Sequence, residues 1–408
     1  MLILADDLGY GSLGCYGSKD VRTPNIDQLA AGGLRLTDFH SNGAVCTPTR
    51  AALMTGRYPQ RCAWVPDDEL SPVFRAQRAK NPDQRWAWGI AEEERTLPKL
   101  LSAAGYRTAL IGKWHLGYDV NFHPMNYGFD EFRGFVGGGI DYHIHIATHG
   151  EKIPDWWHDR EKKNESGYAT DLLTRHAVDF ITRNKESPFF LYLAHASPHS
   201  PWQGRDPESR KPATEIYKEM IEILDESVGS IVQCLRDTQL EKNTLLIFCS
   251  DNGPQGPGGF PATGLLRGKK GTMFEGGHRV PCIASWPSVI PAGKTSGEAV
   301  MTMDFLPTFA KLARAELPPG HVIDGADVLP LFKGEEKLPE RVLHWKHGEA
   351  WAVRQGPWKL MGRGNQPTQL VNLEKDLAET EDLNKENPEL SAQLDQLHRR
   401  WVGEVGPR

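Results

Sequence analysis

The sequence predicts an α/β fold: a large, mostly parallel sheet sandwiched by helices, with a smaller C-terminal subdomain made of an antiparallel sheet and a helix. Three observations support this prediction. Apolar runs of strand length alternate with helical patterns through most of the chain, as in parallel sheets. Several of these runs end in chemically reactive side chains. The chain has 408 residues of ordinary globular composition, which is enough for one large domain and a smaller one.

The expected elements follow from apolar runs and capping residues. Thr23, Pro24 and the pair Gly32-Gly33, for example, supply the cap, first turn and stop of one helix. We expect strands at Leu2–Ala5, Leu34–Phe39, 108–112, 189–195, 245–250 and 280–285. We expect helices at Pro24–Ala31, Pro48–Met54, Leu97–Ala104, Tyr168–Arg183 and Ile216–Arg236. The proline- and glycine-rich stretches Arg61–Glu94 and Gly253–Gly264 are interpreted as long loops, which in compact domains tend to be functional.

The pattern changes near Leu338. Short extended runs at 341–345, 350–355, 358–362 and 369–373 precede a helical pattern at Glu389–Trp401. We interpret this tail as a small antiparallel sheet with one helix. The predicted organisation is a catalytic α/β domain over residues 1–335 and a small α+β subdomain over residues 336–408.

Charge and composition exclude several classes of protein. The net charge of −6 and the lack of a basic block argue against a nucleic-acid partner. No apolar stretch reaches the roughly 20 residues of a transmembrane helix. The sequence shows no signal peptide, but it begins inside its first expected strand. We therefore expect a periplasmic or secreted protein whose signal segment is absent from this chain; the cytoplasm is not excluded. The oligomeric state is left open.

Six scattered cysteines form no CxxC motif, so a structural zinc site is not expected. Cys249 and Cys282 lie in strand-like runs and are interpreted as small buried apolar residues. Cys46 differs, because it comes just before the expected helix at Pro48, with Arg50 one turn further on. The partial charge of the helix end and the arginine predict a depressed thiol pKa and a nucleophile acting on an anionic ester. The spacing to Arg50 is too short for the Cys-x5-Arg loop of cysteine phosphatases.

Reactive side chains follow four of the expected strands, where ligands of open parallel sheets bind. An adjacent Asp pair is more often a solvated turn and a lone histidine is more often structural, so the coincidence of the four strand ends carries the inference. These residues are Asp6 and Asp7, Lys113 and His115, His195 and His199, and Asp251 and Asn252.

The residues Asp6, Asp7, Asp251 and Asn252 offer only oxygen ligands, which favours calcium or magnesium over zinc. The alternative is that Asp251, Asn252 and Gly253 merely form an Asx turn. A cation is preferred, because three acidic groups would otherwise face one another without compensation.

Taken in order, these motifs resemble the sulfatase family of the alkaline-phosphatase-like superfamily, in which a cysteine is oxidised to formylglycine. The resemblance covers nearly the whole chain through LILADDLGYGSLGCYG, CTPTRAALMTGR, GKWHLG, SPHSPW, FCSDNGP and LLRGKKGTMFEGGHRVP. Thr49 stands where the family usually carries the serine of C-x-P-S-R. Cys46, Pro48 and Arg50 are kept, so we expect conversion by a formylglycine-generating enzyme.

The resemblance implies a sulfuric ester hydrolase with residue 46, as formylglycine hydrate, in the role of the nucleophile. One hydroxyl attacks sulfur and the second later drives the release of sulfate. Asp6, Asp7, Asp251 and Asn252, together with residue 46, hold one divalent cation, with calcium preferred and magnesium as the alternative.

The resemblance also implies roles for five further side chains. Arg50 and Lys113 stabilise the formylglycine oxygens and the charge of the sulfate, and His115 handles the proton of the second hydroxyl. His199 and Lys270 bind the sulfate and assist the leaving oxygen, with His199 as the general acid.

The expected substrate is a small sulfated carbohydrate. Tryptophans in loops near the motifs either stack on sugar rings or are buried, and His143 and His145 are candidates to reach the pocket. The tryptophans are Trp86, Trp88, Trp156, Trp157 and Trp202. Two alternatives remain open: a formylglycine-dependent phosphonate or phosphate ester hydrolase, and an inactive homologue that binds sulfated glycans.

Overall fold

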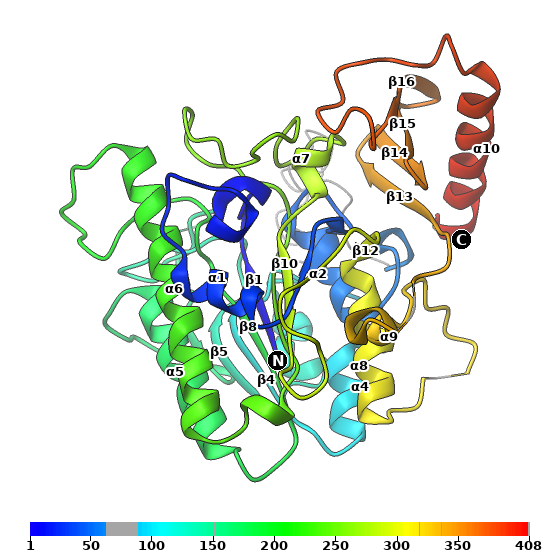
Figure 1. Cartoon of the computed structure of the whole chain (residues 1–408). Coiled ribbons are helices and arrows are strands. Elements are labelled where there is room, and N and C mark those ends of the chain that lie inside the picture. Colours follow the sequence, from blue (N-terminus) through cyan, green and yellow to red (C-terminus); the bar gives the residue numbers. More distant parts are fainter. Residues whose placement is uncertain (63–88, 150–151, 318, 336, 407–408) are drawn as a thin grey trace.

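A ten-stranded sheet forms the centre of the computed structural model, which describes residues 1–62, 89–149, 152–317, 319–335 and 337–406 (Figure 1). The strand order is β11-β2-β10-β9-β1-β8-β4-β5-β6-β7. The strands are β1 (Leu2–Ala5), β2 (Leu34–Leu36), β4 (Arg107–Lys113), β5 (Glu131–Phe135), β6 (Trp157–His158), β7 (Glu161–Lys162), β8 (Phe189–Ala194), β9 (Leu246–Ser250), β10 (Cys282–Ser285) and β11 (Lys294–Ser296).

The five central strands, β9-β1-β8-β4-β5, are all parallel. Strand β10 corresponds to the apolar run expected at 280–285, but it is antiparallel to both β9 and β2. At the other edge, β6 and β7 also run antiparallel. The predicted sheet is therefore confirmed as mostly parallel around its centre, with antiparallel strands toward its edges.

Helices cover both faces of this sheet, because its central strands are apolar on both sides. In β1, Ile3 packs into the core under α1, α5 and α6, whereas Leu2 and Leu4 pack into the core on the opposite face, under α2, α4 and α8 (Figure 1). The first group of helices is α1 (Pro24–Ala31), α5 (Ala169–Arg183) and α6 (Ala213–Asp237), and the second is α2 (Cys46–Thr55), α4 (Leu97–Ala103) and α8 (Phe305–Ala313).

Two local expectations need correction. The run predicted as one strand at Leu34–Phe39 divides into β2 and the separate β3 (Phe39–His40), which pairs with β12 (Val300–Met301) in its own small sheet. Helix α2 begins at Cys46, two residues earlier than predicted, because Pro48 occupies a position in the first turn, where a missing N–H costs nothing.

The tail forms the predicted antiparallel sheet, in the order β13-β14-β15-β16, with α10 (Pro388–Val405) packed against it. Trp345 and Met361 of this sheet share an apolar cluster with Ala52 of α2 and Met301 of β12. The boundary between residues 335 and 336 stays a prediction. The strands are β13 (Val342–His347), β14 (Ala350–Gln355), β15 (Trp358–Arg363) and β16 (Gln366–Asn372).

Two further α-helices of the described residues are short, α7 (Glu275–His278) and α9 (Leu329–Lys333), and single turns of 3-10 helix lie between the elements. None of the helices in the described ranges combines the length and the apolar character needed to cross a bilayer.

Candidate active site

The carboxyl ends of β1, β4, β8 and β9 bring most of the predicted site residues together. Lys113 ends β4, and the turns after β1, β8 and β9 carry the other strand-end residues. Backbone bonds hold these turns side by side: Asp6 N–H donates to the Ser197 carbonyl (3.1 Å) and Asp251 N–H to the Ala5 carbonyl (3.2 Å). Helix α2 and the loop before α7 supply the remaining residues, Cys46, Arg50 and Lys270.

Each of the three acids is paired with a buried cation. Lys113 Nζ lies 2.6 Å from Asp6 Oδ2, and Lys270 Nζ lies 2.8 Å from Asp7 Oδ1. The third pair joins Arg50 Nη2 and Asp251 Oδ2 at 2.7 Å. The expectation that these acids lack compensation is therefore wrong, because three basic side chains distant in sequence reach them.

Two buried oxygens in this cluster nevertheless have no hydrogen-bond partner, Oδ2 of Asp7 and Oδ1 of Asn252. The amide nitrogen of Asn252 donates to Asp7 Oδ1 at 2.6 Å, so the two side chains touch. Asp7 also has a φ of 63°, a left-handed conformation that is uncommon for a residue other than glycine and clusters at functional sites. Unpartnered buried oxygens of this kind fit a hard cation, which takes oxygen ligands.

Burial, reinforced by the negative charges of Asp251 and Asp6, raises the pKa of the Cys46 thiol well above its ordinary value. The expectation of a depressed thiol pKa is therefore wrong. Two carboxylates and the loss of solvent outweigh the helix end and the nearby cations. Sγ of Cys46 lies 3.3 Å from both Asp6 Oδ1 and Lys270 Nζ. An unmodified thiol here is a poor nucleophile.

Thr49 closes the turn that leads into α2. Its hydroxyl accepts a hydrogen bond from Gly43 N–H at 3.1 Å and lies 3.2 Å from the Gly43 carbonyl. Serine carries the same hydroxyl, so these contacts need the oxygen and not the methyl group of threonine.

His115 lies beside the start of α2 in a strained conformation. Its φ is 56°, and its Nδ1 lies 3.4 Å from the hydroxyl of Thr47, the neighbour of Cys46. Gly138 passes directly over the imidazole, where a β-carbon would come within 2.5 Å of His115 Nε2. The glycines after β5 therefore allow the backbone to approach His115 closely.

His199 faces the cluster from the turn after β8. Its Nδ1 lies 2.6 Å from the Ser200 carbonyl, which makes Nδ1 the protonated nitrogen and leaves Nε2 toward Asp7 Oδ2 at 3.7 Å. Burial lowers the pKa of His199 to about 4, although Asp6 and Asp7 act against this change. A bound anion beside Nε2 would favour the charged imidazolium.

Comparison with known proteins identifies the family. The model of the sulfatase domain matches residues 1–315, and the model of the C-terminal part of N-sulphoglucosamine sulphohydrolase matches residues 268–402. The chain belongs to the sulfatase family. This sulfatase is therefore a sulfuric ester hydrolase with an alkaline-phosphatase-like fold, and both expectations from the sequence are confirmed.

Two relatives show how far the likeness extends. The sulfatase is 35% identical to the human N-acetylgalactosamine-6-sulfatase over 367 residues, 86% of this chain and 68% of the relative. It is also 35% identical to Ps i-CgsB, solved in complex with k-i-k-neocarrahexaose, with a TM-score of 0.85 over 98% of this chain and 91% of the other. The phosphonate monoester hydrolase of Agrobacterium radiobacter shares the fold at 18% identity and a TM-score of 0.69, over 99% of this chain and 95% of the other.

Three of the histidines singled out in the sequence have contacts outside the cluster. His143 Nε2 lies 2.9 Å from the Gly204 carbonyl, and the ring contacts Tyr168. His145 is buried and stacks on Trp156 at 4.3 Å. His195 is buried against the hydroxyl of Ser227 at 2.9 Å. In the sulfatase these contacts give His145 and His195 a packing role, whereas His143 stays half-buried at the edge of the loops.

His149 lies beside His199 and was missed in the sequence. Its ring centroid is 5.8 Å from that of His199, and its side chain is exposed. Tyr142 was also missed: its buried hydroxyl donates to the carbonyls of Ala196 (2.8 Å) and His199 (3.0 Å) and so fixes the turn after β8. The histidine-rich run GGGIDYHIHIATHG after β5 was the available signal for both residues.

The described tryptophans are mainly structural. Trp156 is buried, Trp157 lies under Lys162 Nζ, which is 5.2 Å from the ring centroid, and Trp202 packs edge-on against Tyr217. Trp86 and Trp88 lie outside the described residues. Cys249 and Cys282 are fully buried in the sheet, as predicted.

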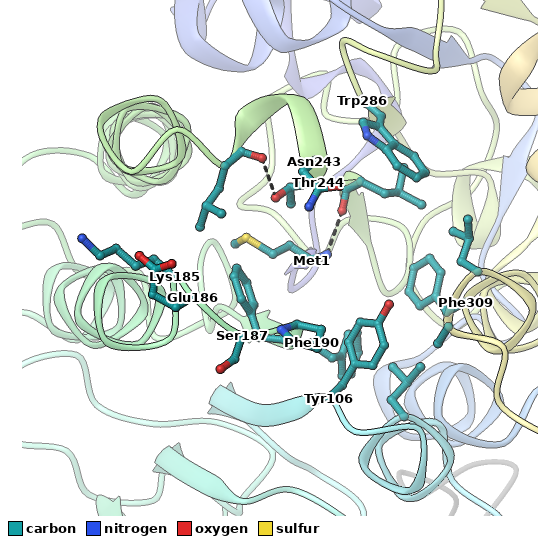
Figure 2. A pocket seen from close by; sticks show the side chains of 17 residues that line it. Met1, Tyr106, Lys185, Glu186, Ser187, Phe190, Asn243, Thr244, Trp286 and Phe309 are labelled. Carbon is teal, nitrogen blue, oxygen red and sulfur yellow. Dashed lines mark hydrogen bonds between the residues drawn. The ribbon is translucent and has the colours of Figure 1, made fainter.

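A cavity of about 520 Å³ lies at the opposite end of the strands (Figure 2). Its wall includes Met1, Phe189, Phe190 and Leu245, which precede or begin β1, β8 and β9. None of the proposed reactive residues lines it. This cavity of the sulfatase is therefore separate from the candidate active site, although it is a prominent hollow of the described surface.

Proposed function

We propose that this sulfatase hydrolyses a sulfate ester of a carbohydrate, with residue 46 oxidised to formylglycine and one divalent cation bound beside it. The observation that carries the proposal is the position of Cys46. Its sulfur is buried between Asp6 and Lys270, in a setting that disfavours a thiolate. Oxidation removes this difficulty, because a hydrated aldehyde offers hydroxyl groups in place of the thiol.

The cation would be held by Asp6, Asp7, Asp251 and Asn252 together with residue 46. When bound, it would polarise the sulfate group and favour the attacking alkoxide. Calcium is the preferred ion and magnesium the alternative, because every ligand offered by the four residues besides residue 46 is an oxygen.

The charges of the site also support an anionic substrate. Arg50, Lys113 and Lys270 balance the three aspartates one for one, so a divalent cation would leave two positive charges in excess. This excess would attract a sulfate ester and stabilise the charge that develops on its oxygens. Lys113 and Lys270 are the side chains free to shift toward sulfate oxygens, because Arg50 also donates to the backbone carbonyl of Lys113.

Two histidines would move protons in the reaction. His115, near Thr47, would accept the proton of the second hydroxyl as that group drives the release of sulfate. His199, with Nδ1–H fixed on the Ser200 carbonyl, would take up a second proton on Nε2 beside the bound sulfate anion and donate that proton to the leaving oxygen. Lys270 would hold the sulfate group and assist this departure.

The proposed substrate class is a sulfated sugar or oligosaccharide. This proposal is supported by the 35% identity to an N-acetylgalactosamine-6-sulfatase and to a protein solved with neocarrahexaose. His149, exposed beside His199, is a candidate contact for the sugar. His143, which is half-buried and bonded to the Gly204 carbonyl, is a second candidate.

A formylglycine-generating enzyme is the implied maturation partner. A periplasmic or secreted location belongs to the same proposal.

The deciding experiment compares leaving groups and central atoms. The protein is expressed with a formylglycine-generating enzyme, loaded with calcium, and offered sulfated mono- and oligosaccharides, an aryl sulfate, and the matching phosphate and phosphonate esters. We expect kcat/KM for the best sulfate ester to exceed that for its phosphorus analogue by at least about 100-fold. A preference for the phosphorus esters would favour the alternative hydrolase, whose fold is shared. Binding of sulfated sugars without turnover by a fully converted protein would instead indicate the inactive glycan-binding homologue.

A further inference from the structure

The segment 267–275 carries Lys270 into the site and contains a short hydrogen-bonded turn, in which the N–H and the hydroxyl of Thr272 donate to the Lys269 carbonyl at 3.0 and 2.7 Å. Gly276 N–H donates to the Arg267 carbonyl at 2.7 Å and closes the segment into a loop. At its tip, Lys270 N–H donates to the Pro254 carbonyl (3.1 Å) and Gly271 N–H to the Ala44 carbonyl (2.8 Å). The position of Lys270 Nζ therefore depends on this turn, on the two contacts at the tip, and on how the two ends of the loop are fixed.

Both ends are fixed by one residue of the tail, Glu379. Its backbone carbonyl accepts a hydrogen bond from Arg267 Nη1 at 2.6 Å, at the start of the segment. Its side-chain Oε2 accepts one from Glu275 N–H, also at 2.6 Å, at the end of the segment. Glu379 lies between β16 and α10, more than a hundred residues away in sequence.

Glu379 is itself held in an unusual and buried state. Its φ is 53°, in the left-handed region, and its side chain is fully buried. Asp376 supports the turn by accepting hydrogen bonds from Thr380 N–H (2.6 Å) and Glu381 N–H (2.8 Å). A strained, buried acid persists only where the surrounding contacts over-determine its conformation.

Lys359 of β15 contacts both Glu379 and Glu275. Its buried Nζ lies 2.9 Å from Glu379 Oε1 and 2.8 Å from Glu275 Oε1, so one lysine bridges both acids, and Glu275 also pairs with Arg279 Nη1 at 3.2 Å. His278 Nε2 lies 3.2 Å from the same nitrogen. Both carboxylate oxygens of Glu379 are therefore engaged, one by the lysine and the other by the backbone N–H at the start of α7, and these charge-assisted bonds tie the tail to the loop.

We propose that Glu379 is a positioning residue for Lys270, through which the C-terminal sheet sets the geometry of the active site. This inference rests on the proposed function, because it takes Lys270 to be the group that holds the sulfate. Glu379 acts at a distance: it fixes Arg267 and Glu275, and the loop between them carries the lysine 2.8 Å from Asp7 and 3.3 Å from Cys46.

The first test measures the loop directly. Glu379→Gln keeps the volume of the side chain but leaves only one acceptor oxygen for Lys359 and Glu275 N–H. We expect faster hydrogen exchange in peptides that cover residues 267–276 of the full-length protein, including the amides of Lys270 and Gly271. The matched control is Arg341→Met, which breaks a pair with buried Asp304 (2.7 Å) next to the same C-terminal sheet but does not touch the loop.

The second test is a double-mutant cycle on the matured enzyme. Glu379→Gln should lower kcat/KM for a sulfate ester by about 10- to 100-fold, because a displacement of Lys270 Nζ by about 1 Å would misplace the group that holds the sulfate. In the Lys270→Ala background the same change should cost less than about twofold, because the residue through which it acts is gone. Arg341→Met should cost equal factors in both backgrounds.

If Glu379→Gln fails to fold, Glu379→Asp decides the question, because the shorter side chain keeps the charge beside Lys359 but cannot also reach Glu275 N–H. It should show the same faster exchange and the same dependence on Lys270. Unchanged exchange over 267–276, or equal losses with and without Lys270, would overturn the proposal. If the wild type hydrolyses no sulfate ester, the proposed function fails, while the exchange measurement still decides whether Glu379 holds the loop.

Discussion

Two nitrogens of Arg50 donate hydrogen bonds to one oxygen of Asp251, Nε at 3.0 Å and Nη2 at 2.7 Å, and both side chains are fully buried. Nη1 of the same guanidinium donates to the backbone carbonyl of Lys113 at 3.0 Å. Arg50 therefore joins α2 to the ends of β4 and β9. Arg50 thus contributes to the stability of the fold as well as to the charge of the site.

Arg50→Lys tests this dual role. Lysine keeps the charge but lacks the planar set of donors, so it cannot bind Asp251 twice and also reach the Lys113 carbonyl. We expect the free energy of unfolding to fall by about 3 kcal/mol, the lower end for a broken buried pair. Activity should fall at least about 100-fold. Denaturant titration and kcat/KM measure the two effects, and a lysine variant of normal stability and activity would show that charge alone is sufficient.

Removal of the cation should abolish activity. Chelation is expected to inactivate the matured protein. Calcium or magnesium should restore activity better than zinc, because the proposed ligands of the cation are mainly oxygens. Asp251→Asn, which retains the shape of the side chain, should weaken calcium binding by at least about tenfold in calorimetry. Asp179→Asn, in an exposed pair with Arg183 on α5, is the matched control. An Asp251 variant with unchanged metal content would remove this residue from the site.

Cys46 should be converted to formylglycine in a competent host, despite the threonine at position 49. Peptide mapping should show the mass loss that accompanies the change of CH2SH to CHO. Thr49→Ser keeps the hydroxyl bonded to Gly43 and should change conversion by less than about twofold. Thr49→Val leaves Gly43 N–H unpaired and should cost about 1 to 3 kcal/mol of stability. An active preparation with a fully unmodified thiol would contradict the mechanism.

His199 and Lys270 should differ in how they respond to the leaving group. A general acid matters most when the leaving alcohol is poor, so His199→Ala should reduce hydrolysis of a sugar sulfate much more than that of an aryl sulfate. Lys270→Ala should reduce both by similar factors, because the sulfate is common to both substrates. Both variants need matched formylglycine content. Equal losses for His199→Ala on the two substrates would reject it as the general acid.

Stability should fall on acidification, and two histidines in the C-terminal sheet and helix should contribute to the loss. Burial lowers the pKa of His344 to about 3 and that of His398 to about 4, and each ring stacks on a tryptophan. The unfolded chain, with histidines near pKa 6.5, then binds more protons than the folded one below that pH, so stability decreases as the pH falls from 6.5 toward 4. We expect each of the two histidines to contribute about 2 kcal/mol of loss between pH 7.5 and pH 5. Urea titrations at pH 7.5, 6 and 5 measure it, and His398→Phe should flatten the curve.

The regular elements of this sulfatase were accessible from the sequence because their signals are local. Leu2–Ala5 and Pro24–Ala31 were predicted with the bounds that the structure has, since an apolar run, a cap and a glycine stop suffice to define them. The direction of β10 was not accessible. An apolar run has the same pattern whether it pairs parallel or antiparallel, and only its neighbours β9 and β2 decide.

The candidate site likewise has features that the sequence predicted and features that only the structure shows. Strand-end positions indicated that Asp6, Lys113, His199 and Asp251 would converge, because parallel strands bring their carboxyl ends to one edge. The pKa of Cys46 was predicted with the wrong sign, because burial and the opposing carboxylates are properties of the assembled site.

By itself, the sequence determined which elements form, which side chains carry the chemistry and to which family the protein belongs, because these depend on residue type and on spacing along the chain. Only the tertiary structure decided which charges are paired, which oxygens of Asp7 and Asn252 remain without partners, and that Glu379 fixes the loop of Lys270. The physical reason is that these are contacts between segments many residues apart. Their energies depend on distance and burial, which no local pattern encodes.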